Sequence, residues 1–108
     1  MLYQFTKYFY GVKKNFTSEY KYSLGEDIIS LLWKCLDEVI EANSYPNHQK
    51  KPKINELSVS YDKVKIRIRM SHDMGLISVR QFAHIEENYM LEIGRMIGGW
   101  AEWAENSL

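Results

Sequence analysis

Three histidines and a single cysteine are the residues of this chain with the chemistry for catalysis or metal binding. His84 and Glu87 are three residues apart in a helical pattern, which puts both side chains on one face of a helix. Helical bundles that hold two metal ions use two Glu-x-x-His motifs and two further carboxylates, and this chain has no Glu-x-x-His. A solvated or helix-packing histidine is the alternative. The sequence therefore predicts no metal site and no cofactor.

The remaining reactive side chains do not form a catalytic group either. His72 and Asp73 have the types of a general base and the residue that orients it, but no motif puts a nucleophile beside them. A polar turn that ends a helix is the simpler interpretation. Cys35 lies on the apolar face of a predicted helix, where a buried, unreactive thiol is expected. The chain also has no glycine-rich phosphate loop, so the sequence predicts that it is not an enzyme.

The charges are more informative in their distribution than in their sum, which is zero. Residues 47–69 contain seven basic and two acidic residues, a net charge of +5, whereas residues 86–108 contain one basic and five acidic residues, a net charge of −4. A basic loop that leads into a basic helix can contact phosphates, and an ordinary solvated face beside opposite charges is the alternative. The candidate nucleic-acid contacts are Lys50, Lys51, Lys53, Lys63, Lys65, Arg67 and Arg69.

A glycine-rich segment near the end of the chain interrupts a pattern that is otherwise helical. Each glycine destabilises a helix interior by about 1 kcal/mol relative to alanine, so three of them indicate a close approach of the backbone to another element. Large tryptophans near a chain end are also typical of protein interfaces, although they can simply close a core. The pattern leaves open whether the contact lies inside one bundle or between subunits. The residues concerned are Gly94, Arg95, Gly98, Gly99, Trp100 and Trp103.

Composition limits the class of protein. A chain of 108 residues with 45% hydrophobic and 26% charged residues predicts one soluble globular domain, residues 1–108. One cysteine cannot form a disulfide within the chain, which is typical of a reducing cytoplasm. No apolar run reaches the roughly 20 residues that a membrane span needs, and the first residues do not have a signal-peptide pattern. We therefore expect a cytoplasmic protein without membrane contact.

The first half of the chain predicts two helices. Apolar residues at steps of three and four form one stripe over residues 2–16: Leu2, Phe5, Phe9, Val12 and Phe16. After a polar stretch, Ser23 and Glu26 have the spacing of a capping box, which predicts that a second helix begins there and runs to about Asn43. The residues of this helix expected to face inward are Ile28, Leu32, Cys35, Leu36, Val39 and Ile40.

The segment after the loop of residues 44–53 is ambiguous. Apolar residues at positions 54, 57, 61, 64 and 68 follow helical spacing over about 15 residues, whereas residues 64–70 alternate strictly, as in a strand. We favour a helix, because the helical pattern is longer and a lone strand would have no partner.

The last segment predicts one long helix. Gly75 can end the preceding helix in the left-handed conformation, and Ser78 with Gln81 forms a second capping box. The apolar face then consists of Phe82, Ile85, Tyr89, Ile93, Met96, Trp100 and Trp103. Four amphipathic helices joined mainly by short links predict an all-α fold, an up-down-up-down four-helix bundle.

Several short motifs resemble one known family over nearly the whole chain, from about Phe5 to Trp103. This family is the Avd-like four-helix bundle proteins, the accessory variability determinants of diversity-generating retroelements. A more distant likeness is to the four-helix proteins encoded in 23S rRNA intervening sequences. The motifs are Leu24-Gly25-Glu26, Ala42-Asn43, Ile68-Arg69-Met70 with Asp73, and the most specific one, Glu92-Ile93-Gly94-Arg95-Met96-Ile97-Gly98-Gly99-Trp100.

The resemblance implies a non-catalytic accessory protein. Avd proteins form homopentameric barrels, bind RNA or DNA through basic surfaces, and associate with the reverse transcriptase of the retroelement. Avd proteins are typically strongly basic, whereas this chain is neutral, so nucleic-acid binding would depend on the cluster from Lys50 to Arg69. The alternative is a structural or protein-interaction bundle of the intervening-sequence type without a nucleic-acid role.

Overall fold

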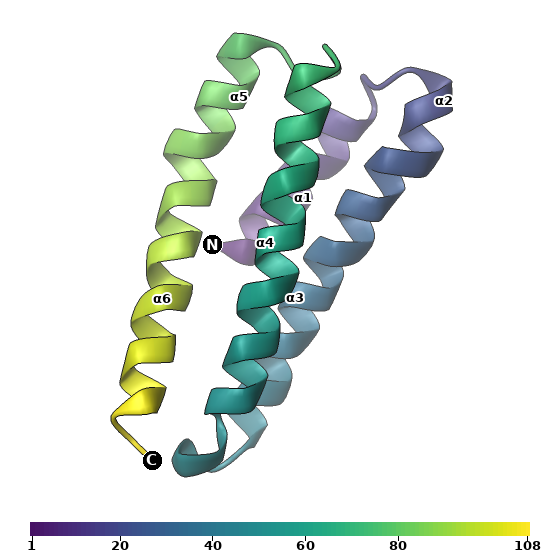
Figure 1. Ribbon diagram of the computed structural model, residues 1–108. Coiled ribbons are helices and arrows are strands. Elements are labelled where there is room, and N and C mark those ends of the chain that lie inside the picture. Colours follow the sequence, from purple (N-terminus) through teal and green to yellow (C-terminus); the bar gives the residue numbers. More distant parts are fainter.

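The computed structural model describes all 108 residues as four helical rods that lie side by side (Figure 1). The chain reverses direction at each connection, which confirms the predicted all-α, up-down-up-down four-helix bundle. The rods are α1 (Leu2–Lys13); α2 (Ser18–Tyr20), the π-helical turn η1 (Lys21–Gly25) and α3 (Glu26–Ser44); α4 (Lys51–Asp73); and α5 (Val79–Ile85), the π-helical turn η3 (Glu86–Met90) and α6 (Leu91–Glu105). A short 3-10 turn, η2 (Asn47–Gln49), lies between α3 and α4.

The ambiguous third segment is a helix, as predicted, and its strand-like alternation has a simple cause. Val64 and Ile68 are buried in the main core. Ile66 and Met70 lie on the opposite face of α4, where 59% and 51% of their surfaces are exposed. The alternation therefore records two apolar faces on one helix, of which only one packs into the core.

The second rod begins before the predicted capping box. Ser23 lies inside the π-helical turn η1, and its hydroxyl donates a hydrogen bond to the backbone carbonyl of Glu19 at 2.9 Å. The carboxylate of Glu26 accepts a hydrogen bond from the Lys13 ammonium at 2.6 Å. The predicted start at Ser23 is wrong because a capping box needs a non-helical first residue, and here the helical backbone already begins at Ser18.

The inward face of α3 is narrower in its second half than predicted. Ile28, Leu32 and Cys35 are buried, but Ile40 is 68% exposed. The reason is the length of α1, whose 12 residues run beside only part of α3 (Figure 1). Where α1 is missing, no fourth rod covers that side of α3, so the inclusion of Ile40 in the core was wrong.

The last rod is one continuous stack of turns whose core face shifts at η3. A π-helical turn holds one residue more than an α-helical turn, so it rotates everything that follows by about one residue. Met90 is buried at the end of η3, and past it the buried positions are Ile93, Ile97 and Ala104. The predicted inward positions Met96 and Trp103 are instead exposed, because the prediction carried uninterrupted α-helical spacing through the turn.

The signals at the turn before the last rod are confirmed. Gly75 has φ of +78°, a left-handed conformation that ends α4. The hydroxyl of Ser78 accepts a hydrogen bond from the backbone amide of Gln81 at 3.1 Å. The loop before α4 is shorter than predicted, because Pro52 fits into the first turn of a helix that already begins at Lys51.

One buried hydrogen bond joins α4 to the shifted turn of the last rod. The hydroxyl of Tyr61 donates to the backbone carbonyl of Met90 at 2.6 Å, and burial is the main reason why the pKa of Tyr61 is raised above its usual value. The ring of Tyr61 lies beneath α6, where a Cβ added to Gly94 would be 3.7 Å from it. The hydrogen bond from Tyr61 therefore stabilises the π-helical turn from the side of α4.

Replacing Tyr61 by phenylalanine tests this link. We expect Tyr61→Phe to lower the free energy of unfolding by about 1–3 kcal/mol, because the buried Met90 carbonyl loses its donor while the ring volume stays nearly the same. Urea unfolding followed by circular dichroism measures the change. Tyr3→Phe is the control, since Tyr3 is 60% exposed. Equal stability of the two variants would contradict a structural role for the Tyr61 hydroxyl.

Candidate interaction surfaces

Lys50 is used inside the fold. Its side chain is 7% exposed, and its ammonium donates to the backbone carbonyls of Ala42, Asn43 and Tyr45 at 2.8, 3.3 and 2.5 Å. The last carbonyls of a helix have no partners within it, and a lysine ammonium can satisfy them. Lys50 thus closes the end of α3 and does not present its charge to solvent.

Lys51 and Lys53 join neighbouring rods. Lys51 forms an ion pair with Glu105 at the end of α6. Lys53 contacts Glu41 of α3 at 2.7 Å and Glu56 of α4 at 2.6 Å, and these hydrogen bonds, Glu41 first, raise the pKa of Lys53 above its usual range. Both charges are balanced within the chain, so this end of the predicted basic cluster has little free positive charge.

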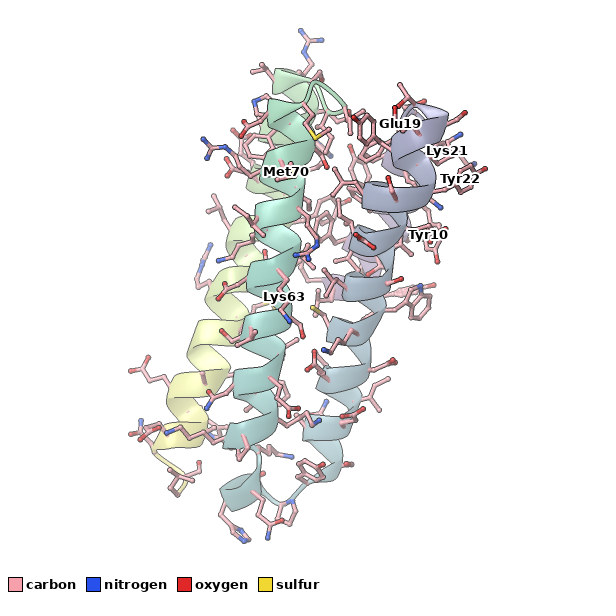
Figure 2. All side chains as sticks on the ribbon, turned by 45° about the vertical axis from the view of Figure 1, so that its right-hand side comes forward. Tyr10, Glu19, Lys21, Tyr22, Lys63 and Met70 are labelled. Carbon is pink, nitrogen blue, oxygen red and sulfur yellow. The ribbon has the colours of Figure 1, made fainter.

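The other predicted cations lie along the second half of α4, and Figure 2 shows Lys63 and Met70 on this helix. Lys65 pairs with Asp62 at 3.1 Å, and Arg69 reaches Asp73 at 3.4 Å. Arg67 donates to the backbone carbonyl of Lys63 at 3.0 Å. These contacts are exposed and weak, so the four cations can turn toward a partner at little cost.

An apolar stripe lies among these cations on the outer face of α4. Val59, Ile66 and Met70 are spaced by seven and four residues, and each is more than half exposed. This surface was not predicted from the sequence, although the alternation in residues 64–70 was its signal. Exposed apolar side chains in a row, flanked by charges, are typical of a surface that contacts another macromolecule.

The glycines of α6 are not required by packing within this chain. A Cβ added to Gly94 would make an ordinary contact with Tyr61, and one added to Gly98 or Gly99 would meet nothing within 4 Å. Arg95 is also exposed and pairs only with Glu92, at 2.9 Å. Gly98 and Gly99 therefore leave a smooth strip of exposed helix backbone, open to a contact from outside the bundle.

Beside this strip, an apolar cleft of about 370 Å³ opens where α1 begins. Trp100 is half-buried in its wall, and Trp103, one turn further along α6, is 41% exposed. All lining residues are hydrophobic, and they come from α1, α3, α4 and α6 together with Met1. The cleft exists because α1 does not extend along the full length of α3 and α6 (Figure 1). Of the six predicted contact residues, Trp100 lines this uncovered part of the core, and the other five lie outside the lining.

The candidate catalytic residues make packing and hydrogen-bond contacts within the fold. His72 stacks on Phe82 with ring centroids 4.6 Å apart, and its Nδ1 is 3.1 Å from the carbonyl oxygen of Ile77. Nδ1 of His84 is 3.0 Å from the side-chain amide of Asn88. Burial, and secondly Glu38, raise the pKa of the Cys35 thiol to about 12, so it stays protonated. No three His, Cys, Asp or Glu side chains come together so that they could hold a metal ion.

The buried ammonium of Lys50 leads to a stability prediction. We expect Lys50→Met to lower the free energy of unfolding by about 1–3 kcal/mol, because the carbonyls of Asn43 and Tyr45 lose their donor and that of Ala42 keeps only a backbone amide. The control is Lys51→Met, which removes only a surface ion pair and should cost less than about 1 kcal/mol. Urea unfolding of both variants measures the difference. If Lys51→Met proved the more damaging, Lys50 would not be the cap of α3.

Comparison with known proteins identifies the family of the chain. The model of the bAvd-like family matches residues 1–104, nearly the whole sequence, so the chain belongs to this family. The family is of the retroelement-accessory, non-catalytic kind. No curated protein and no solved structure matches the chain. None of the helices is both long and apolar enough to span a lipid bilayer.

Proposed function

We propose that this bAvd-like chain is a cytoplasmic, non-catalytic accessory protein of a diversity-generating retroelement. In this role it assembles into a homo-oligomer, most simply a pentamer, that contacts RNA or DNA and the reverse transcriptase. The observation that carries the proposal is the outer face of α4, where four cations surround an exposed apolar stripe. A surface of this kind offers charge to phosphates and apolar area to a protein.

The cations of α4 support the nucleic-acid part of the proposal. Lys63, Lys65, Arg67 and Arg69 lie within two turns of one helix. Lys65 and Arg69 pair with solvent-exposed carboxylates, and Arg67 donates to a backbone carbonyl. Phosphates can replace such partners readily, with release of counterions. A symmetric assembly would repeat the cluster once per subunit, which compensates for the zero net charge of the single chain.

The glycine strip of α6 supports the assembly part. Three helix-interior glycines that serve no packing purpose inside the chain are expected where another backbone comes close. The strip lies beside the apolar cleft with Trp100 in its wall, so a second subunit seated there would also cover exposed core. The acidic end of the chain and the basic α4 would attract each other between subunits.

A second candidate function is a protein-interaction bundle without a nucleic-acid role. The apolar stripe of Val59, Ile66 and Met70 favours it, since phosphates gain nothing from such side chains. A gene position beside a reverse transcriptase gene and a pair of near-identical repeats would support the retroelement role. A gene position without them would favour the second candidate.

Binding of structured RNA and of an RNA–DNA hybrid across a salt series tests the nucleic-acid part. We expect the affinity to fall steeply with salt, with a slope of about −0.9 per neutralised phosphate for a duplex. Replacing Lys63, Lys65, Arg67 and Arg69 by glutamine should flatten the slope and weaken binding at least tenfold. The matched control replaces Lys7, Lys14, Lys21 and Arg80 by glutamine, which removes the same charge elsewhere. Absence of binding even at low salt, or equal losses in both variants, would contradict the proposal.

Alanine substitutions in α6 test the assembly part. We expect wild-type protein to scatter light as an oligomer, with about five times the 12.8 kDa chain mass for a pentamer. Gly98→Ala combined with Gly99→Ala should stabilise the isolated helix by about 1 kcal/mol per site and yet weaken assembly, because two methyl groups fill the strip. Gly11→Ala is the control, as Gly11 also has open space around its Cα. A clean wild-type monomer, or an unchanged oligomer in the double variant, would overturn this part.

A further inference from the structure

A polar groove of about 590 Å³ runs between α3 and α4, apart from the apolar cleft. Eleven residues line it, and Val59 is the only hydrophobic one. Because α3 and α4 are antiparallel, Lys34 and Lys63 lie toward one end of the groove and Glu41 and Lys53 toward the other, with Glu38 between them. Its lower end is occupied by Lys53, which bridges Glu41 and Glu56. Lys34 and Lys63 line the upper part, where no ion pair joins them to an acid of the groove.

Glu38 lies in the wall of this groove and is unusual for an acid in a small domain. Its side chain is 5% exposed, and its Oε1 is buried without any hydrogen-bond partner. Neither Lys34 nor Lys63 forms an ion pair with it, although both line the same groove. A buried carboxylate without a partner destabilises the folded state, so the site lacks a positively charged donor.

The missing donor has to reach a buried oxygen from outside. A metal ion does not fit, because no third ligating side chain joins the carboxylates here. An arginine fits better: its long side chain reaches into a groove, and its planar guanidinium can donate two parallel hydrogen bonds to a carboxylate. A lysine ammonium is more strongly hydrated and cannot form this paired contact.

The surroundings of the groove indicate that a protein carries this arginine. Val59 belongs both to the groove and to the exposed stripe with Ile66 and Met70, so the polar groove continues into an apolar surface. Arginines that enter desolvated pockets beside apolar contacts are typical hot spots of protein interfaces. A free polyamine would gain nothing from the stripe, whereas an arginine carried by a protein brings apolar neighbours that can cover it.

We propose that the groove between α3 and α4 is a docking site for an arginine side chain of a partner protein, with the Glu38 carboxylate as its acceptor and the stripe of α4 as the adjoining apolar contact. Docking here requires neither nucleic-acid binding nor assembly through α6. The docking site and the proposed function can therefore fail separately.

Titration of the full-length protein with acetyl-arginine amide tests the proposal. At constant ionic strength we expect saturable shifts of backbone amide NMR signals around Glu38, Ser60 and Val59, in the millimolar range. The neutral analogue acetyl-citrulline amide should produce none, and acetyl-lysine amide weaker ones. Glu38→Gln should reduce the arginine shifts at least fivefold. Asp37→Asn, which removes an exposed acid of the same groove, is the matched control and should retain them.

Three results would overturn the proposal. The first is the absence of arginine-dependent shifts, and the second is equal shifts in wild-type protein and Glu38→Gln. The third is stronger binding of spermidine than of acetyl-arginine amide at the same sites, because the groove would then be a general cation site.

Thermal unfolding gives an independent measurement. Glu38→Gln removes a buried charge without a partner and should raise the unfolding midpoint by roughly 2–5 °C, whereas Asp37→Asn should leave it nearly unchanged. Acetyl-arginine amide should raise the midpoint of the wild-type protein but not that of Glu38→Gln, since a ligand stabilises only the state that binds it. A lower midpoint in Glu38→Gln would show that Glu38 is paired inside the fold, and would also overturn the proposal.

Discussion

The hydrogen bond from the Tyr61 hydroxyl to the Met90 carbonyl fixes the arrangement on which the outer surfaces depend. It joins the middle of α4 to the π-helical turn η3, and that turn sets the rotation of all of α6. With the extra residue in the turn, Ile93 and Ile97 face the core while Gly98 and Gly99 face solvent. Without it, uninterrupted α-helical spacing would rotate the later residues by about 100° and put Met96 inside. A single turn thus decides which side of α6 is available to a partner.

The two faces of helix α4 have different functions, one in the core and one at the surface. One face contributes Leu57, Val64 and Ile68 to the main core, and the opposite face leaves Ile66 and Met70 exposed among cations. The first turns of α4 use their lysines to join α3 and α6, and only the later turns retain cations with weak partners. The cations at the start of α4 therefore stabilise the fold, and those in its later turns are available for binding.

Several features were predictable from sequence because they depend on neighbouring residues. The Ser78 cap, the left-handed Gly75 and the apolar stripe of α1 each follow from patterns within a few positions, and all three are found, except that Phe16, the last member of the predicted stripe, is buried beyond the end of α1 at Lys13. The helix over the apolar stripe of residues 54–68 was also predicted, since this stripe is longer than the competing alternation, although α4 extends further at both ends, to Lys51 and Asp73.

Other features depend on the path of the chain in space, and local patterns do not record them. Lys50 can donate to the end of α3 only because the loop folds back on that helix. Ile40 is exposed because α1 begins too far along the bundle to cover it. The two π-helical turns have no characteristic amino-acid composition by which the sequence could reveal them. Glu38 resembles any surface acid of a helix, although it falls between the buried Cys35 and Ala42 at helical spacing, which was the available signal.

The features of the chain that weaken its fold are also those that form the proposed contact surfaces. A domain of this size has a net stability of about 5–15 kcal/mol, and three helix-interior glycines remove about 3 kcal/mol of it. The uncovered stripe of α4 and the unpaired carboxylate of Glu38 act in the same direction. None of the three has a compensating contact inside the chain. Contacts made from outside would compensate each of them: backbone against the glycines, apolar area on the stripe, and a cation on Glu38. The proposed assembly would therefore account for three features that contacts within the chain leave unexplained.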